Sequence, residues 1–242
     1  MFMAGERIIY SASDLAAAAR CEYALLRAFD AKLGWAEGVT VEDELLARTA
    51  ALGDEHEQRR LDQLRTDHDG EVAVIGRPFP FTVENITAAA AATRRAIDRD
   101  APVIYQAAMF DGRFVGFADF LVRRNGQYQV SDTKLARSAK VTALLQIAAY
   151  ADTLHRAGIP VFDEAELILG NGTEVDYRVD ELIPVYLEQR DRLQQLLDEH
   201  YAGGAPVRWN DERVRACFRC PVCDEQVRAT DDLLLVAGMR VT

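Results

Sequence analysis

The sequence predicts an α/β fold in which helices flank a mixed sheet. With 242 residues and 49% hydrophobic composition, the chain is long and apolar enough to bury a sizeable core. Runs rich in β-branched and aromatic residues alternate with stretches of helical periodicity. The sequence contains neither an internal repeat nor a low-complexity linker long enough to divide it. We therefore expect one integrated domain with three regions: a helical region over 1–100, a sheet-rich core over 101–180, and a C-terminal helix with a cysteine-rich segment over 181–242.

Four elements are expected in the first hundred residues: a helix over 13–30, a helix over 41–68, a short strand over 71–75 and an alanine-rich helix over 83–99. The first begins with the capping residues Ser13 and Asp14 and places Cys21 on a helix. The second carries His56 among many charged residues. A lone histidine on such a helix is usually a solvated surface residue.

The most informative stretch runs from Phe114 to Tyr150. Two strand-like runs flank Asn125-Gly126, a dipeptide that readily takes the positive φ angles of a type I′ turn. A two-residue loop would set Asp119 directly opposite Asp132, with Cβ atoms about 5 Å apart. Like charges in that arrangement are destabilising unless they are compensated, and a divalent cation is the obvious compensator. Lys134 would share their face, where an ammonium can orient a nucleophilic water and stabilise charge on a phosphate.

A strand over 102–110 leads into this hairpin through a tight turn at Asp111-Gly112, which makes a three-stranded meander. Counting through that turn places Gln106 opposite Phe117, and Phe117 in turn opposite Lys134. Gln106 either borders the same face of the sheet or has a purely structural role.

Helical periodicity follows the hairpin. Ser138 is the expected N-cap, and the helix closes at Gly158. Gln146 and Tyr150 are spaced i, i+4 and so share one face of this helix. Three further elements are expected: a strand over 159–170 that returns parallel to the sheet, a hairpin at Asn171-Gly172 and a helix over 181–201 with Pro184 in its first turn.

Taken singly, these signals are weak, since Asp-x-Lys is common and Gln146 with Tyr150 would ordinarily be a polar residue and a core aromatic. Their order is specific: an aspartate, a hairpin, Asp132-Thr133-Lys134, then Gln146-x-x-x-Tyr150 on a helix. This order resembles the PD-(D/E)XK nuclease superfamily, in particular its RecB-like branch. The resemblance implies a restriction-endonuclease-like core that hydrolyses DNA phosphodiester bonds with Mg²⁺ or Mn²⁺. It also implies a substrate of single-stranded DNA or DNA ends, exonuclease rather than endonuclease action, and a role in DNA repair or recombination.

The resemblance assigns roles residue by residue. His56, Asp119 and Asp132 would hold the metal with help from the Thr133 carbonyl; His56 follows Gly53 as the metal-binding histidine of RecB-like nucleases follows a glycine. Lys134 would position or polarise the attacking water. Gln146 and Tyr150 would hold the site and the DNA backbone.

A second chemical signal follows the flexible break at 203–206. Cys217, Cys220 and Cys223 recur at two-residue intervals, and Cys21 is the remaining cysteine of the chain. Disulfides are disfavoured without a secretion signal, which leaves structural Zn²⁺ or a [4Fe-4S] cluster; spacing does not separate the two. A subset of RecB-like nucleases, including CRISPR-associated ones and that of the AddAB complex, has one cysteine before the nuclease motifs and three after. The resemblance implies a [4Fe-4S] cluster that clamps the two ends of the domain, although the last gap is shorter here than in many relatives.

Charge and sequence ends set the remaining expectations. The net charge of −11 argues against loose, charge-driven binding to nucleic acid, so contact with DNA should be local and metal-dependent, or another domain delivers the DNA. The start lacks a signal peptide and the chain lacks a long apolar run, so we expect a cytoplasmic protein without a membrane partner. The apolar C-terminal end and the resemblance suggest a helicase domain in a longer full-length chain.

Two other classes stay open. One is a non-catalytic DNA-binding or assembly platform of a helicase-nuclease complex, which the acidic charge favours. The other is a zinc-stapled binding module whose acidic hairpin is incidental.

Overall fold

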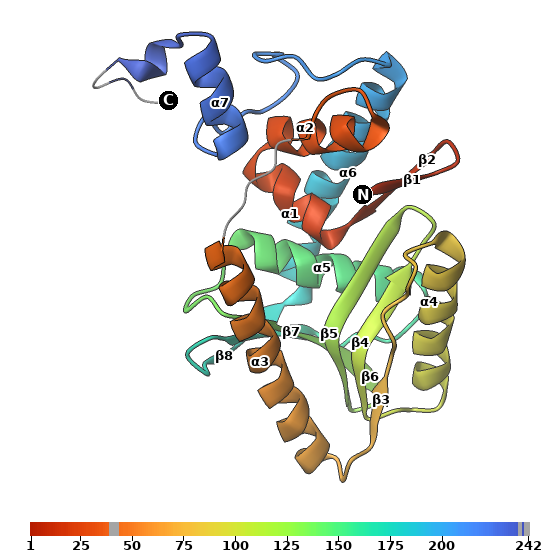
Figure 1. The fold of residues 1–242 in the computed structure, drawn as a ribbon. Coiled ribbons are helices and arrows are strands. Elements are labelled where there is room, and N and C mark those ends of the chain that lie inside the picture. Colours follow the sequence, from red (N-terminus) through yellow and green to blue (C-terminus); the bar gives the residue numbers. More distant parts are fainter. Residues whose placement is uncertain (39–43, 237–238, 240–242) are drawn as a thin grey trace.

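A mixed sheet forms the centre of the computed structural model, which describes residues 1–38, 44–236 and 239 (Figure 1). Its strands are β1 (Phe2–Ala4), β2 (Arg7–Ser11), β3 (Val72–Val74), β4 (Val103–Phe110), β5 (Phe114–Arg124), β6 (Gln127–Lys134), β7 (Glu164–Leu169) and β8 (Glu174–Arg178). The helices are α1 (Ala12–Arg20), α2 (Glu22–Leu33), α3 (Glu44–Asp67), α4 (Val83–Asp98), α5 (Val141–Arg156), α6 (Val179–Gly203), α7 (Pro221–Ala229) and the short 3₁₀ helix η1 (Leu233–Leu235). The predicted fold class is confirmed.

Strands follow the order β1-β2-β5-β6-β7-β8, and β4 pairs with β5 on one side and β3 on the other. The β6–β7 pair is parallel, as expected for a strand that returns after the α5 crossover, and β7–β8 is an antiparallel hairpin. Helices α1, α2 and α6 gather at one end of the sheet, together with the C-terminal α7 (Figure 1). None of the described helices combines the length and apolar character that crossing a membrane requires.

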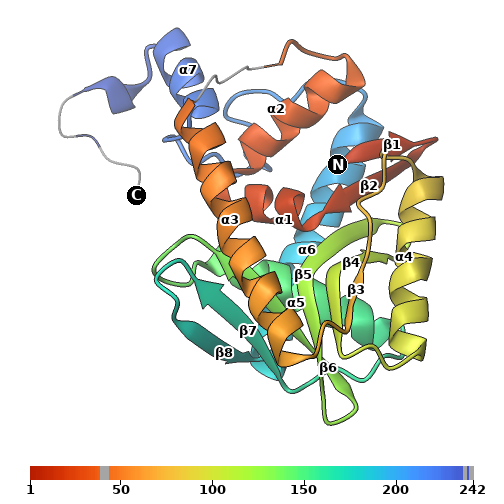
Figure 2. The same ribbon diagram turned by 60° about the horizontal axis from the view of Figure 1, so that its bottom comes forward.

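Two helices cover opposite faces of the central strands. Alternate residues of a strand point to opposite faces. Leu61 of α3 belongs to one apolar cluster with Phe120 and Val122 of β5, whereas Leu121 belongs to the main core with Ile147 of α5. Figure 2 shows α3 lying across the sheet, on the side turned toward the viewer. The site residues of the β5–β6 hairpin therefore lie between two helices.

The β5–β6 hairpin has the predicted register. Arg124 pairs with Gln127, and the ladder continues to Phe120↔Ser131. Asn125 (φ 52°) and Gly126 (φ 82°) supply the two positive φ angles that a type I′ turn requires.

The expected register between β4 and β5 is wrong by two residues. Phe110 pairs with Val115, because the Asp111 carboxylate accepts hydrogen bonds from the backbone N–H groups of Arg113 (2.9 Å) and Phe114 (2.6 Å) and so lengthens the turn. Ala108 therefore faces Phe117, in place of Gln106. Gln106 falls opposite Asp119, between two paired positions, and takes a φ of 56° that interrupts the ladder.

Several element boundaries also differ from expectation. The helix expected over 13–30 is two helices that meet at Cys21, whose backbone is extended (φ −166°, ψ 105°). Its true N-cap is Ser11, in a capping box with Asp14. Helix α5 begins after Lys140 instead of Ser138, and α6 begins at Val179, which puts Pro184 inside the helix. Helix α3 is described from residue 44; the expected start over 41–43 lies outside the described residues.

Sequence analysis missed the N-terminal hairpin β1–β2, whose strands turn at Gly5 with a φ of 62°. Strand β2 runs parallel to the start of β5, with Tyr10 opposite Phe114 and Ser11 opposite Val115. It takes this place because β6 pairs with the other end of β5, from Phe120 onward. Among the described residues, β5 therefore has no strand partner on this side at Asp119, between β2 and β6.

Candidate active site and cysteine cluster

Asp119 and Asp132 lie one position beyond the end of the β5–β6 ladder. There a side chain replaces the backbone carbonyl as hydrogen-bond acceptor: Asp119 Oδ2 accepts hydrogen bonds from the Thr133 backbone N–H and from Thr133 Oγ1, each at 2.8 Å. Asp132 is 2% exposed, and Lys134 Nζ donates to its Oδ2. The strand ends thus hold two carboxylates and one ammonium together.

The charges of this group are unbalanced. Burial, and then the charge of Asp119, raise the pKa of Asp132 to about 7, although Lys134 pulls it down. Burial lowers the pKa of Lys134, but Asp132 and Asp119 outweigh it and the net shift is upward. One ammonium does not neutralise two carboxylates, so a cation held here would lower the electrostatic cost of the ionised pair.

Helix α5 brings Gln146 and Tyr150 into the same cavity as Asp119, Asp132 and Lys134, a hollow of about 1080 Å³. Tyr150 packs against β5 at Gly116, where a Cβ atom would lie 2.6 Å from Tyr150 Cε1. Burial, and then the two nearby aspartates, raise the pKa of Tyr150 well above its ordinary value, so its hydroxyl stays protonated and can donate. The structure therefore brings together five of the predicted site residues.

His56 is not among them. It is 7% exposed, its Nε2 lies 3.2 Å from the Ile168 carbonyl oxygen and its Nδ1 lies 3.5 Å from Arg59 Nη2. Its place on α3 directs the ring to β7, and the next residue, Glu57, reaches the aspartate group. Burial, and then the charge of Asp119, raise the pKa of Glu57.

Sequence reasoning missed Glu57. Its carboxylate accepts hydrogen bonds from Tyr105 and from Gln106 Nε2, and Arg77 Nε donates to Gln106 Oε1 at 3.1 Å. Burial, and then Glu57, raise the pKa of Tyr105 to about 12. Gln106, at the distorted position of β4, therefore bridges Glu57 and Arg77, and Arg77 lines the cavity. The available signal was the Gly-x-x-His-Glu sequence, which offers two possible ligands at adjacent positions.

All four cysteine thiols lie within 4.8 Å of one another. Cys21 comes from the junction of α1 and α2, Cys217 and Cys220 from the segment before α7, and Cys223 from the first turn of α7. The sulfur atoms of Cys21 and Cys223 are 3.5 Å apart, well beyond an S–S bond length, and all four cysteines are free thiols. This grouping can hold one metal centre.

Backbone N–H groups surround the thiols. Ala24 N and Cys217 N each lie 3.4 Å from Cys21 Sγ, while Cys220 N lies 3.3 Å and Arg219 N 3.5 Å from Cys217 Sγ. Burial would raise the pKa of Cys217, but hydrogen bonds from these two N–H groups and from Cys220 and Cys21 outweigh it and lower that pKa to about 7, whereas burial raises the pKa of Cys220 and of Cys223. The extended backbone of Cys21, which breaks the expected helix, turns its thiol toward the other three. Since the thiolate is the metal-binding form, the arrangement fits a thiolate-bound metal centre.

A mixed sheet whose central hairpin presents paired aspartates and an Asp-x-Lys sequence to one cavity defines a nuclease of the restriction-endonuclease-like class. A family model described as the PD-(D/E)XK nuclease superfamily matches residues 10–224, and the chain belongs to this superfamily. Its members use divalent metals and act on DNA. Among solved structures, the chain is similar to a protein from Eubacterium rectale described as a "putative exonuclease". The two are 14% identical over 96% of this chain and 94% of that one, with a TM-score of 0.52, a likeness of fold. No curated protein sequence matches the chain.

Proposed function

We propose that the protein is a RecB-like, metal-dependent deoxyribonuclease that hydrolyses phosphodiester bonds in single-stranded DNA or at DNA ends. The observation that carries this proposal is the convergence of Asp119, Asp132 and Lys134 with Gln146 and Tyr150 in one cavity. The likeness to a protein described as an exonuclease favours exonuclease over endonuclease action. A role in DNA repair or recombination, a cytoplasmic location and a helicase domain as partner belong to the same proposal.

The donor set fits a hard divalent cation, because the charge of Asp119 raises the pKa of both Glu57 and Asp132, and a cation held among the three carboxylates would offset this repulsion. Asp119, Asp132 and Glu57 would hold Mg²⁺ or Mn²⁺, with the Thr133 carbonyl as a further oxygen ligand. Glu57 takes the role that the sequence resemblance gave to His56. The bound ion would supply Lewis-acid chemistry and activation of water.

The other side chains act on the substrate. The Lys134 ammonium can hold the attacking water in line and stabilise the charge that develops on the phosphate oxygens. Its hydrogen bond to Asp132 fixes its position and uses one of the three N–H donors of the ammonium, which leaves two for the water and the phosphate. Gln146 and the protonated Tyr150 hydroxyl present hydrogen-bond donors from α5, which suits them to hold the DNA backbone beside the site.

For the cysteine cluster we propose a [4Fe-4S] centre with a structural role; Zn²⁺ is the alternative. Four thiols within reach of one another and the N–H groups that point at them support a thiolate-bound centre. The order of the cysteines, one before the nuclease motifs and three after, supports iron-sulfur. Anaerobically purified protein should be brown with iron and sulfide bound; a colourless protein containing zinc would overturn this assignment.

A non-catalytic platform remains the second candidate, favoured by the net charge of −11. A platform has no need of paired buried carboxylates beside an ammonium, which oppose stability unless a cation is bound. The test is cleavage of end-labelled single-stranded DNA by anaerobically purified protein, in Mn²⁺ or in chelator, with Asp132→Ala as control. Cutting that needs metal and fails in Asp132→Ala supports the nuclease. Intact DNA with a loaded cysteine cluster would favour the platform.

A further inference from the structure

The cavity extends beyond the aspartates along a set of aromatic rings, which we call the aromatic row: Phe2, Phe81 and Phe117. The Phe2 and Phe81 ring centroids are 5.6 Å apart at 72°, and those of Phe81 and Phe117 are 6.2 Å apart at 48°. The rings come from β1, from the segment before α4 and from β5. Phe117 precedes Asp119 by two residues, so the row begins beside the proposed reaction centre.

The row is only partly covered by protein. Phe81 is 48% exposed, and Phe2 and Phe117 are half-buried. Apolar rings that stay accessible inside a hollow continuous with a reaction site are typical of a ligand surface.

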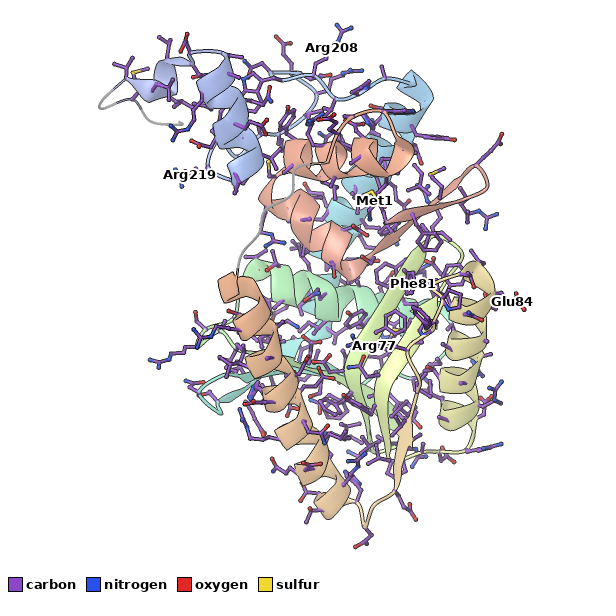
Figure 3. The ribbon with its side chains drawn as sticks, in the orientation of Figure 1. Met1, Arg77, Phe81, Glu84, Arg208 and Arg219 are labelled. Carbon is purple, nitrogen blue, oxygen red and sulfur yellow. The ribbon has the colours of Figure 1, made fainter. Side chains whose placement is uncertain are left out.

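Basic groups lie along the same cavity. Arg77 and Lys32 line it, and the Nε of Arg77 is anchored to Gln106, which in turn holds Glu57. Figure 3 shows Arg77 and Phe81 on the segment between β3 and α4. Aromatic faces beside a few cations match single-stranded nucleic acid, whose unpaired bases stack while its phosphates meet the positive charge. In a duplex the bases are already stacked and paired, and their faces are not available.

We propose that the aromatic row is a base-stacking subsite for unpaired nucleotides of DNA next to the bond that is cut, with Arg77 on the backbone. This inference rests on the proposed nuclease function and names the feature that selects single strands. Stacking contributes binding free energy that does not depend on neutralising phosphates, so it can offset the unfavourable net charge of −11.

The test is equilibrium binding of two fluorescent DNA probes in Ca²⁺, an oligothymidylate and an abasic strand of equal length and charge. Phe81→Ala should weaken oligothymidylate binding by about tenfold, the usual effect of losing one stacked base. Its binding of the abasic strand should not change, and Phe81→Trp should restore oligothymidylate binding. Arg77→Gln should weaken both probes equally and reduce the slope of log affinity against log salt by about 0.7.

Phe79→Ala is the matched control. Phe79 lies two residues from Phe81 and is 94% exposed, but it does not line the cavity. This variant should bind both probes as the wild type does. The subsite would be overturned if Phe79→Ala and Phe81→Ala lost the same affinity for oligothymidylate, or if Phe81→Ala lost the same affinity for both probes. Tighter binding of duplex than of single strands by the wild-type protein would also overturn it.

Cleavage is scored separately in Mn²⁺. Wild-type protein that binds oligothymidylate over the abasic strand but never cuts it would sink the nuclease proposal and leave the subsite standing. Protein that cuts DNA but binds the two probes with equal affinity would overturn the subsite and leave the nuclease proposal standing.

Discussion

Two adjacent residues of α3 have opposite surroundings, and for this reason the proposed ligand role falls to Glu57. His56 is held by the Ile168 carbonyl, whereas Glu57 is held next to the aspartates by Tyr105 and Gln106. Successive residues on a helix are rotated by about 100°, so only one of the two can face the aspartates once the helix is docked.

Glu57→Gln should therefore lower Mn²⁺-dependent cleavage by about a hundredfold or more, since a catalytic metal supplies several kcal/mol of transition-state stabilisation. His56→Gln, whose amide can still donate to Ile168, should stay within about threefold of wild type. The measurement is kcat/KM on end-labelled DNA. A large loss in His56→Gln with little loss in Glu57→Gln would return the ligand role to the histidine.

The raised pKa of Asp132 predicts a pH dependence. Below about pH 7 the carboxyl holds a proton that the metal must displace, so Mn²⁺ affinity should rise about tenfold per pH unit between pH 5 and 7 and then level off. Without metal, the sign for stability is opposite. A carboxyl whose pKa is raised on folding stabilises the fold at low pH, and this contribution is lost as the pH rises toward 7. Mn²⁺ titrations by calorimetry across this range check the first trend; an affinity independent of pH would contradict it.

At the level of strands, the geometry of the site depends on how β6 and β7 end. The strands β6 and β7 end at the parallel pair Lys134↔Leu169. Just beyond it, Gly170 packs directly against the Leu135 backbone. A Cβ atom at Gly170 would lie 2.2 Å from the Leu135 carbonyl oxygen, a clash that moves backbone and not a flexible side chain.

Gly170→Ala should therefore destabilise the fold by about 1–3 kcal/mol, the usual cost of overpacking, and displace Lys134. Chemical denaturation and Mn²⁺-dependent cleavage should both show a loss. Gly203→Ala is the matched control, because nothing lies within 4 Å of a Cβ atom there and alanine favours the helix. If Gly170→Ala were as stable as Gly203→Ala, the close approach of the two strand ends would be wrong.

Hairpins show how far local sequence fixes register. Asn125-Gly126 encodes its turn through two positive φ angles, and the facing positions of the aspartates, one step beyond the end of the ladder, follow from it. Asp111-Gly112 is a similar turn dipeptide, yet the Asp111 carboxylate accepts hydrogen bonds from the backbone N–H groups of Arg113 and Phe114 and so lengthens the turn. The dipeptide alone does not reveal which of these two outcomes occurs.

Across the full fold, the cysteine cluster joins segments that are far apart in sequence. Cys21 follows only the short strands β1 and β2 and precedes β3 to β8, whereas Cys217, Cys220 and Cys223 follow β8. Around it, Arg192 of α6 also bonds Glu22 at 2.7 Å, and the Tyr23 and Trp209 rings meet at 5.0 Å. The cluster therefore completes a packed end of the molecule that holds α1 and α2 beside α6 and α7.

Removing the bound centre, or changing Cys21→Ser, should lower the melting temperature by about 10 °C or more, because the free energy of metal binding is also folding free energy. Calorimetry with metal analysis checks this. Arg219→Ala is the control, since it changes an exposed side chain beside the cluster and keeps all four thiols. Apo protein that melts at the temperature of the loaded protein would contradict the structural role.

What could be predicted from the sequence is what depends on near neighbours. Asp119, Asp132 and Lys134 fall into place through one turn and the two-residue repeat of strands, and Gln146 and Tyr150 through the helical repeat. The grouping of the four cysteines, by contrast, was expected from a family resemblance, since spacing in sequence carries no information about a contact made across the fold.

Tertiary structure decided the rest. The proposed role of Glu57 in place of His56 depends on how α3 docks. The position of Gln106 depends on how the Asp111 carboxylate binds the following turn, and the aromatic row depends on an N-terminal hairpin that pairs with β5. Each of these depends on contacts between segments distant in sequence. Periodicity shows which face of an element is apolar, but the partner of that face, and the side chains that this partner brings into reach, exist only once the chain has folded.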